Sequence, residues 1–394
     1  MNFTKTKKND YRSRNRKNRS SRVKKRPAGF DLNKLINAPG TSHEPIQDAP
    51  RRKFSDMHLQ LPLAKNLSGR GFDYPTAIQD QTFEAILEGR DILGIANTGT
   101  GKTAAFLMPI IQQLLSGKEF QSLVVVPTRE LAQQVQKEFF LLTKGTKLFS
   151  SCFIGGTTIS ADYKLLKKKN HVIIGTPGRL LDLVERKALP LEKTSVLILD
   201  EFDRMLDMGF VNDVKRITKA MQHRKQTLLF SATEDGSQKS LVADILNKPV
   251  KVKVSTGHSI SSDVSQEAIR VQGKDKTQLL IDMIMQQELK KVLVFAETKR
   301  QVNQLEKKLS QARIATGLIH GNKSQNQRTQ ALNSFRKNKI KVLVATDVAA
   351  RGIDVADITH VINFQVPQTL DSYIHRIGRT GRAGKKGTAI TFID

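Results

Sequence analysis

Three carboxylates follow one apolar run in the stretch VLILDEFDRM. Asp200, Glu201 and Asp203 lie within four positions, directly after four apolar residues. One acid at such a place could cap a following helix, but three are more than a cap needs. Carboxylates at this density are typical of a site that binds a divalent cation or activates a water molecule. The sequence therefore predicts a catalytic site at the end of this strand-like run.

A glycine-rich turn ends an earlier apolar run, in the stretch ILGIANTGTGKT that closes at Thr103. Glycines allow backbone N–H groups to turn toward a phosphate, and the N-terminus of a following helix adds partial positive charge. We expect Lys102 to reach the β and γ phosphates of a nucleotide and the Thr103 hydroxyl to bind Mg²⁺. The usual pattern has glycine where Ala96 stands, although Gly99 and Gly101 are present. The match to a P-loop therefore fails at one residue.

These two segments together favour hydrolysis of a nucleoside triphosphate. A Mg²⁺ that bridges phosphates needs a carboxylate at the C-terminal end of a nearby parallel strand, where open α/β sheets bind ligands. Asp200 is predicted to hold that ion through water molecules, and Glu201 to orient and deprotonate the attacking water. The alternative, that the acids only cap the next helix, fits one of them but not all three.

The segments between these motifs alternate between strand-like and helix-like patterns. Short β-branched runs are separated by helical patterns such as ELAQQVQKEFFLL, which is typical of βαβ units. The runs begin at 92, 122, 172, 196 and 227 and, after a polar interval, at 291, 314, 341, 360 and 388. We therefore predict an α/β fold with two lobes, each a parallel sheet covered by helices on both faces.

The composition sets the predicted boundaries. Residues 1–50 are predicted to be a disordered basic tail and linker, in which FDLNKLI could form one helical turn. The first lobe is predicted over 51–248 and the second over 263–394. Residues 249–262, within the stretch NKPVKVKVSTGHSISSDV, are polar and rich in serine, so we predict a linker there.

The charge of the chain indicates a polyanionic partner. The chain has 65 Lys and Arg against 37 Asp and Glu, for a formal net charge of +28. Residues 1–26 hold twelve Lys or Arg and one Asp, and such a run repels itself and is too poor in apolar residues to fold. We predict that this tail adds non-specific nucleic-acid binding. A tail that only aids solubility, or that binds phospholipid, is the alternative, but no amphipathic stretch accompanies it.

Composition also argues against several classes of protein. The longest apolar runs are strand-sized, far below the roughly 18 residues of a membrane span, and no apolar segment follows the basic N-terminus as in a secretory signal. The single cysteine, Cys152, excludes an internal disulfide and is predicted to be a packed core residue in a reducing compartment. The eight histidines lack zinc-binding spacing. We expect a cytoplasmic protein, or a nuclear one if the host is a eukaryote, and in either case an intracellular one.

The chain from about residue 54 to its end resembles the DEAD-box ATP-dependent RNA helicases, which have two tandem RecA-like lobes. The resemblance rests on motifs in the family's order: GFDYPTAIQ, ANTGTGKT, PTREL, GG, TPGR, DEFD, SAT, VFAETK, HGNKSQNQR, ATDVAARGID and YIHRIGRTGR. So many motifs in one order make coincidence negligible. The resemblance implies RNA-stimulated hydrolysis of ATP that separates short RNA duplexes or remodels RNA–protein complexes, without reading sequence.

The resemblance also implies that the nucleotide is ATP. Gln79 is similar to the family's adenine reader, and an amide side chain can both donate to and accept from the adenine edge. Asp354 is similar to the family's ribose contact. The residues that the resemblance assigns to ATP are Phe54, Thr76, Gln79, Thr98, Gly99, Thr100, Gly101, Lys102, Thr103 and Asp354.

Two arginines of the second lobe are similar to the family's arginine fingers. The resemblance places Arg379 and Arg382 on the γ-phosphate, where such fingers are worth about 10³–10⁵ in rate. Ordinary surface charge is the alternative for these two residues. We also predict that Asp203 bonds to Ser231 or Thr233, which would couple the ATP site to closure of the lobes.

A set of polar residues from both lobes resembles the family's RNA-backbone contacts. Their hydroxyl, amide and guanidinium groups suit phosphate and sugar and carry no base code. Contacts to 2′-hydroxyls would be needed to prefer RNA over DNA. The set consists of Arg129, Gly156, Thr176, Arg179, Gln325, Arg328 and Thr346.

Phe202 departs from the family, which has alanine at this place in the DEAD motif. A side chain of this size after a buried strand must find a pocket or displace the following helix. We interpret it as a packing variant, because the acids on either side are intact, and it could alter the coupling through Asp203. Asn97 and Thr100 also differ from the family but keep small or polar turn-forming residues.

Two other functions stay open on the sequence. The same motifs would serve an ATP-gated RNA clamp that acts as a scaffold and unwinds little. A DNA-translocating helicase is the second alternative, and the GFxxPTxxQ element and the short DEFD motif argue against it.

Overall fold

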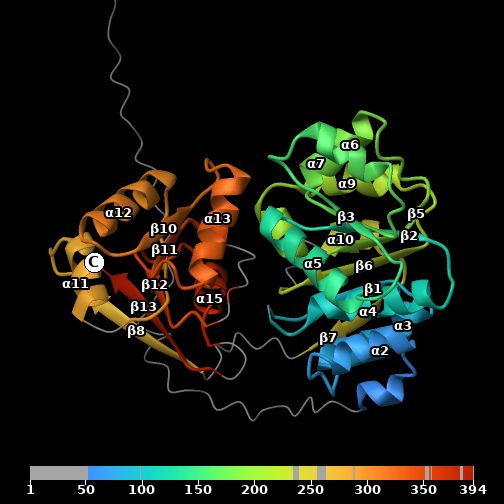
Figure 1. The fold of residues 1–394 in the computed structure, drawn as a ribbon, viewed down its shortest axis with the longest axis horizontal. Helices are drawn as coiled ribbons and strands as arrows, with labels where there is room; N and C mark the ends of the chain where they lie inside the picture. Colours follow the sequence, from blue (N-terminus) through green and yellow to red (C-terminus); the bar gives the residue numbers. More distant parts are fainter. Residues whose placement is uncertain are drawn as a thin grey trace, which may run out of the picture.

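The computed structural model contains two α/β lobes, which Figure 1 shows from blue to yellow-green and from yellow-orange to red along the chain. The structure describes residues 52–97, 99–233, 239–254, 263–286, 289–350, 355, 357–381 and 385–393. The predicted tail over 1–50, with the helical turn proposed for FDLNKLI, lies outside the described residues.

The first lobe is built on a seven-stranded parallel sheet. Its strands lie in the order β3 (Ser150–Phe153), β4 (Val172–Gly175), β2 (Gln121–Val125), β5 (Thr194–Leu199), β6 (Gln226–Ser231), β1 (Ile92–Ile95) and β7 (Val250–Lys253). The central strands are buried on both faces, which explains their continuous apolar sequences. Because the strands are parallel, the segments that follow β1 and β5 reach the same edge of the sheet.

Alternate residues of these strands contribute to two apolar layers. One layer packs against α2 (Leu61–Ser68), α3 (Ala77–Leu87), α4 (Lys102–Leu115) and α5 (Arg129–Leu142), next to the 3-10 helix η1 (Phe54–Met57). The other packs against α6 (Ile159–Leu166), α7 (Pro177–Glu185), α8 (Phe202–Asp207), α9 (Val211–Ala220) and α10 (Lys239–Ile245). Helices therefore cover both faces, as predicted.

The second lobe repeats this architecture on a six-stranded parallel sheet. Its strand order is β10 (Thr316–Ile319), β11 (Val342–Ala345), β9 (Val292–Phe295), β12 (His360–Asn363), β13 (Gly387–Ile393) and β8 (Val264–Arg270). One face packs against α11 (Lys276–Gln286) and α12 (Lys299–Gln311), and the other against α13 (Gln325–Arg336), α14 (Asp347–Ala350) and α15 (Leu370–Ile377). The predicted α/β class is confirmed for both lobes.

The first lobe extends further along the chain than the sequence suggests. The predicted linker over 249–262 contains β7, which pairs with β1 in parallel register. In β7, Val252 is buried and Lys251 and Lys253 are exposed. A short, half-buried edge strand of this kind resembles a polar connector in sequence. The first lobe therefore ends after β7 rather than at 248, whereas β8 begins the second lobe next to the predicted position.

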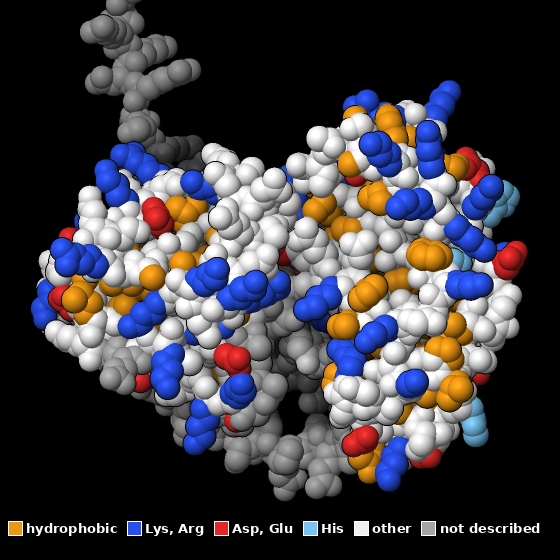
Figure 2. All heavy atoms as spheres, in the orientation of Figure 1, with side chains coloured by type: hydrophobic (Ala, Val, Ile, Leu, Met, Phe, Trp, Pro, Cys, Tyr) orange, Lys and Arg blue, Asp and Glu red, His pale blue; other side chains and the backbone are white. Residues whose placement is uncertain are grey.

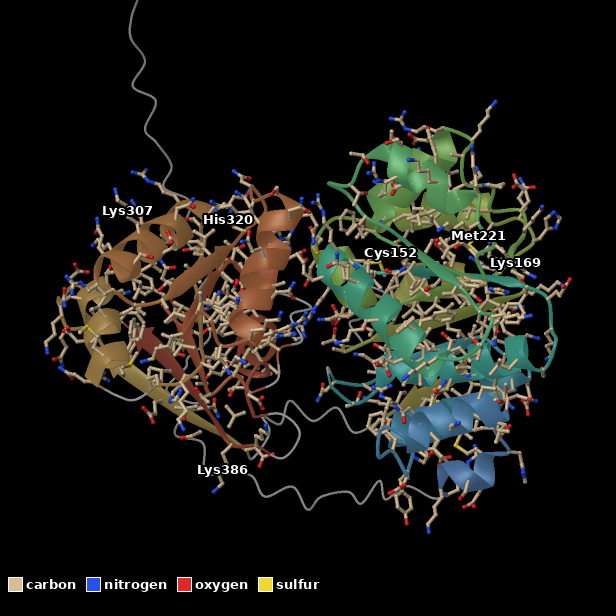
Figure 3. All side chains as sticks on the ribbon, in the orientation of Figure 1. Cys152, Lys169, Met221, Lys307, His320 and Lys386 are labelled. Carbon is tan, nitrogen blue, oxygen red and sulfur yellow. The ribbon has the colours of Figure 1, made fainter. Side chains whose placement is uncertain are left out.

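Cys152 lies on β3 inside the first lobe (Figure 3), where it is partly buried against the apolar core. Burial raises the pKa of its thiol to about 12. The thiol therefore stays protonated at neutral pH and behaves as a small packed residue.

Basic side chains are spread over both lobes on the face that Figure 2 shows, with fewer acidic ones between them. A broad positive surface of this kind attracts polyanions without selecting a sequence. Among the described residues, no helix combines the length and the apolar character that crossing a membrane requires.

Candidate active site

The glycine-rich turn after β1 leads directly into α4. Gly99 and Gly101 have φ values of 93° and 90°, which glycine adopts without strain. Lys102 is the first residue of α4 and is buried, and its Nζ donates to the Ala96 carbonyl at 2.5 Å. The turn therefore presents backbone N–H groups and a lysine at a helix N-terminus, which is the arrangement that binds phosphates.

Asp200 follows β5 and is buried at the edge of the sheet that carries this turn. Its Oδ1 accepts the Glu201 backbone N–H at 2.9 Å. Burial raises the pKa of Asp200 to about 7, although the Lys102 charge opposes this and the Glu201 charge adds to it. The charges of Lys102 and Asp200 thus act on one another in the structure.

Glu201 precedes α8 with an unusual backbone. Its φ of 52° and ψ of 50° lie in the left-handed region, which residues with a side chain seldom adopt. Its Oε2 accepts from Arg204 Nη1 at 2.5 Å. Burial is the largest influence on the pKa of Glu201 and would raise it, but the charges of Arg204, Arg379 and Lys102 hold it below its ordinary value. Glu201 is therefore a buried, ionised carboxylate.

Arg379 comes to this site from the second lobe. It is buried, and its Nε donates to the His375 carbonyl at 3.2 Å. Its positive charge helps to lower the pKa of Glu201, which belongs to the first lobe. The other predicted finger, Arg382, and the predicted ribose contact, Asp354, lie outside the described residues.

The predicted adenine reader lies against the glycine-rich turn. Gln79 Oε1 accepts the Thr76 backbone N–H at 3.0 Å, and its Nε2 donates to the Gly101 carbonyl at 3.1 Å. A Cβ added at Gly101 would lie 2.4 Å from Gln79 Nε2, so this glycine permits a close approach. Phe54 is buried in the apolar layer to which α3 and α4 also contribute. Thr98 lies outside the described residues. The structure thus joins the predicted base-reading and phosphate-binding segments.

The oxygens of Asp200 and Thr103 fit a magnesium ion chemically. Both are hard ligands, and Mg²⁺ usually takes one or two protein oxygens and completes its shell with phosphates and water. Burial gives the Asp200 carboxyl a pKa of about 7, so a bound cation would favour its ionised form. In the described parts of the chain, no group of three or more His, Cys, Asp or Glu could hold a metal.

Asp203 links α8 to the segment that follows β6. Its Oδ2 accepts from the Ala232 backbone N–H at 3.3 Å and from Thr233 Oγ1 at 3.5 Å. Ser231 instead donates its hydroxyl to the Thr233 carbonyl at 2.8 Å. The structure therefore places Asp203 beside Thr233, and its role in coupling stays a prediction.

Phe202 is fully buried at the start of α8, in the apolar layer between the sheet and α7 to α10. Met205, one turn later, is buried in the same layer. The phenylalanine therefore finds a pocket while the neighbouring acids keep their contacts.

The predicted RNA-binding residues of the first lobe lie at the same edge of the sheet. Arg129 packs against Gly156, because a Cβ added there would lie 2.4 Å from Arg129 Nη1. Thr176 precedes α7 at the end of β4. Arg179 pairs with Asp162 at 2.9 Å and Asp182 at 3.3 Å, so its guanidinium already has two acidic partners. An RNA contact from Arg179 would have to compete with these acids.

The predicted RNA-binding residues of the second lobe meet the first lobe through Glu130, which the sequence analysis did not single out. Arg328 Nη2 donates to Glu130 Oε2 at 2.7 Å, and Gln325 Nε2 donates to Glu130 Oε1 at 3.3 Å. Arg129 Nη1 also lies 3.5 Å from Gln325 Oε1. Glu130, Gln325 and Arg328 are all buried. The sequence did offer one signal for Glu130: it is an acid directly after Arg129, whereas the predicted RNA-binding residues are arginines or uncharged.

Thr346 follows β11 and is buried at the carboxyl edge of the second sheet. Its backbone N–H donates to the Ile319 carbonyl at 3.4 Å. It therefore lies at the edge from which α13 also starts.

The chain matches two protein families. The family described as DEAD/DEAH box helicase matches residues 76–241, and the helicase conserved C-terminal domain matches residues 275–384. DEAD-box ATP-dependent RNA helicase RhpA of Helicobacter pylori (strain B128) is 39% identical over 359 residues, which are 91% of this chain and 73% of RhpA.

Two solved structures superpose on both lobes together. One is a variant of Dbp5 of S. cerevisiae bound to RNA and ADP BeF3, with a TM-score of 0.78 and 30% identity, over 87% of this chain and 89% of that chain. The other is the DEAD-box helicase Mss116 bound to ssRNA and UDP-BeF, with a TM-score of 0.79 and 31% identity, over 86% of this chain and 74% of that chain. Such values over both lobes mean that their relative placement here is similar to that in these ligand-bound structures.

Proposed function

Because the chain belongs to the DEAD-box family of ATP-hydrolysing RNA helicases, with two RecA-like lobes, we propose that it hydrolyses ATP between its lobes to separate short RNA duplexes or remodel RNA–protein complexes. We also propose Mg²⁺ as its metal ion. The single cysteine and an RNA substrate fit a reducing compartment inside a cell.

The observation that carries this proposal is that charged groups of the two lobes act on one another at both predicted ligand sites. Near the ATP-site residues, the Arg379 charge of the second lobe acts on Glu201 of the first. Among the RNA-binding candidates, Arg328 of the second lobe pairs with Glu130 of the first. A ligand at either place would favour the same closed arrangement, so ATP and RNA affinities would be coupled reciprocally.

The first lobe supplies the groups that bind ATP and activate water. Gln79 and Thr76 would hold the adenine beside the glycine-rich turn, while Lys102 and the backbone N–H groups before it would bind the phosphates. A bound Mg²⁺, held by Thr103 and Asp200, would neutralise charge on the phosphates. The ionised Glu201 would accept the proton of the attacking water.

The second lobe supplies positive charge for the transition state. Arg379 would stabilise the charge that develops on the transferred phosphoryl group, together with Arg382. Because Arg379 belongs to the second lobe and Glu201 to the first, hydrolysis would depend on closure of the lobes. Asp354 would hold the ribose from the same lobe.

RNA would bind along the carboxyl edges of both sheets. Arg129, Gly156, Thr176 and Thr346 offer guanidinium, backbone and hydroxyl groups that suit phosphate and sugar. The basic tail over 1–26 would add a non-specific tether. Closure around one strand would bend it in a way that a duplex cannot follow, and hydrolysis would reopen the lobes and release the RNA.

A second candidate function is an ATP-gated RNA clamp. The observation that favours it is the burial of the Glu130–Arg328 ion pair, because a buried pair that must be broken before the lobes open would slow release. A clamp would hold RNA and an ATP analogue for a long time and release few duplex strands.

The deciding experiment compares RNA with DNA as activators of ATP hydrolysis. We expect single-stranded RNA to raise kcat well above its value with DNA of the same sequence, and ATP to release the strands of a short RNA duplex. Equal stimulation by DNA would contradict the RNA assignment. RNA stimulation without strand release, but with a long-lived complex, would favour the clamp.

A further inference from the structure

Arg204 on α8 is among the most deeply buried charged side chains in the described chain, with 1% of its surface exposed. Removing a guanidinium from water costs several kcal/mol unless an acid compensates for it. Charged residues are therefore seldom buried without a specific partner. Because Arg204 is buried, we expect it to have an acidic partner.

That partner is Glu201, whose Oε2 lies 2.5 Å from Arg204 Nη1. Glu201 is 6% exposed, so both members of the pair are shielded from water. Among the described side chains, Arg204 has no other acidic partner within salt-bridge distance, and its buried Nη2 has no hydrogen-bond partner there. The pairing is therefore specific to these two residues.

The pair constrains Glu201 at its side chain, while a second contact constrains its backbone. The Glu201 N–H donates to Asp200 Oδ1 at 2.9 Å, and its φ of 52° holds the residue in the left-handed region. Arg204 occupies Oε2 and leaves Oε1, for which the described chain offers no hydrogen-bond donor. One carboxylate oxygen is thus fixed and the other remains for a ligand.

We propose that Arg204 is a positioning residue, which binds Oε2 of Glu201 so that Oε1 faces the attacking water. This inference rests on the proposed role of Glu201 in hydrolysis. Arg204 touches neither ATP nor water in this role and acts only through Glu201. A carboxylate held at one oxygen loses less rotational freedom when it binds water, which is the advantage of a preorganised site.

A purely structural role for the pair makes a different prediction. Buried ion pairs are weak stabilisers, and apolar residues of similar size often replace them without loss, whereas removing one partner alone leaves a buried charge. A structural role would therefore change the melting temperature and the binding of ATP and RNA together. A positioning role would lower kcat while ATP and RNA binding persist.

The test is Arg204→Met, which keeps much of the side-chain volume and removes the charge. We expect kcat for RNA-stimulated ATP hydrolysis to fall about 10–100-fold, as for other residues that orient a reacting group. The KM for ATP and the affinity for RNA should change by less than about threefold, because the binding residues are intact. Arg204→Lys, which can still donate to Oε2, should recover at least half of the loss on a logarithmic scale.

The matched control is Arg216→Met on α9. Arg216 also pairs with a glutamate, Glu185, but both side chains are more than half exposed and lie outside the site. The control should keep the parental kcat. Should Arg204→Met fail to fold, Arg204→Leu replaces it, because leucine is smaller and, like methionine, cannot donate to the carboxylate. A folded, uncharged variant with kcat within twofold of the parent would overturn the proposal, as would a lysine variant no faster than the methionine variant.

A double variant separates this inference from the proposed function. If both residues act as one unit, Glu201→Gln with Arg204→Met should turn over no more slowly than Glu201→Gln alone. Substantial turnover by Glu201→Gln would remove Glu201 from hydrolysis, and the proposed function would fail at that point. If Glu201→Gln loses turnover but Arg204→Met keeps a normal kcat, the positioning role of Arg204 is contradicted and the proposed function stands.

Discussion

The two lobes share one sheet architecture but bring opposite charges to the surface where they meet. The first lobe contributes the buried acids Glu130 and Glu201. The second contributes Arg328, which pairs with Glu130, and Arg379, whose charge acts on Glu201. The lobes therefore recognise one another by charge as well as by shape, and anionic ligands that bind near these arginines can bias closure.

The lobes also differ in how far each site is complete on its own. In the first lobe, Glu201 already pairs with Arg204, and the charge of Lys102 acts on the Asp200 carboxylate. In the second lobe, Arg376 has its own acid, Asp347, at 2.6 Å, whereas Arg328 takes its acid from the other lobe. The catalytic acids of the first lobe are therefore held in place within that lobe. Arg328 of the second lobe gains its acidic partner only when the lobes close.

The largest loss of activity is expected from removing the cation of the second lobe that acts on Glu201. Arg379→Ala should lower kcat about 10³–10⁵-fold, because the charge on the phosphoryl group loses its compensation. ATP binding to the first lobe should change little. The measurement is RNA-stimulated ATP hydrolysis, with Lys386→Ala as control, because Lys386 is an exposed cation of the same lobe (Figure 3). A loss below tenfold would mean that Arg379 is not a finger.

The matching change in the first lobe is Glu201→Gln. It should lower kcat about 10²–10⁴-fold, because glutamine keeps the shape but cannot accept the proton of water. Binding of ATP and RNA should persist, since the phosphate-binding turn is untouched. Single-turnover hydrolysis and equilibrium binding are the measurements, and Glu185→Gln is the control at an exposed glutamate. Undiminished hydrolysis would remove Glu201 from the role of base.

A third change tests whether the lobes are joined through Glu130. Glu130→Gln and Arg328→Met should each weaken RNA binding in the presence of an ATP analogue, since either one leaves a buried group unpaired. The effect should be about 10²-fold, and the double variant should be no weaker than the worse single variant. RNA affinity with the analogue is the measurement. Additive losses would show that the two residues act independently.

Sequence alone could predict those parts of the site that parallel strands bring together. Lys102 follows β1 and Asp200 follows β5, and β1 and β5 flank β6 in the sheet, so motif order and strand pattern suffice to place them at one edge. The apolar runs also predicted the central strands, because strands buried on both faces contain few polar residues.

The remaining features depend on packing between distant segments. Glu130 and Arg328 are 198 residues apart, and only the placement of the two lobes pairs them. Arg204 could have been an exposed helix residue, since nothing in its local sequence indicates complete burial. The edge strand β7 alternates valine with lysine, which a polar connector also can do. These features were missed because contacts between elements, rather than local pattern, determine them.

Removing the buried charge of Asp200 should change the stability of the first lobe rather than its catalysis alone. The pKa of about 7 means that the folded chain holds this proton more tightly than an unfolded chain, where an aspartate has a pKa near 3.8. The ionised carboxylate therefore costs stability at pH 8, and that cost disappears as the pH falls through 7 toward 4. Without nucleotide, Asp200→Asn should melt higher than the parent at pH 8 by roughly 5 °C, from a difference on the order of 2–4 kcal/mol.

Thermal melting at pH 8 and pH 6 in EDTA measures this difference. The advantage of the asparagine variant should be smaller at pH 6, and Asp213→Asn, a variant on α9 outside the site, is the control. An asparagine variant less stable than the parent at pH 8 would mean that the pairing with Lys102 outweighs the burial of Asp200.

The smallest effect on turnover is expected outside both lobes, from deletion of residues 1–26. This stretch holds twelve Lys or Arg and one Asp, so its contacts with phosphates would release counterions whatever the RNA sequence. The deletion should weaken RNA affinity about tenfold at moderate salt and flatten the dependence of affinity on salt concentration. At saturating RNA, kcat should stay within about twofold, because the charges that act on ATP belong to the lobes. An unchanged salt slope would show that the tail does not contact RNA, and a large fall in saturated kcat would show that it takes part in closure.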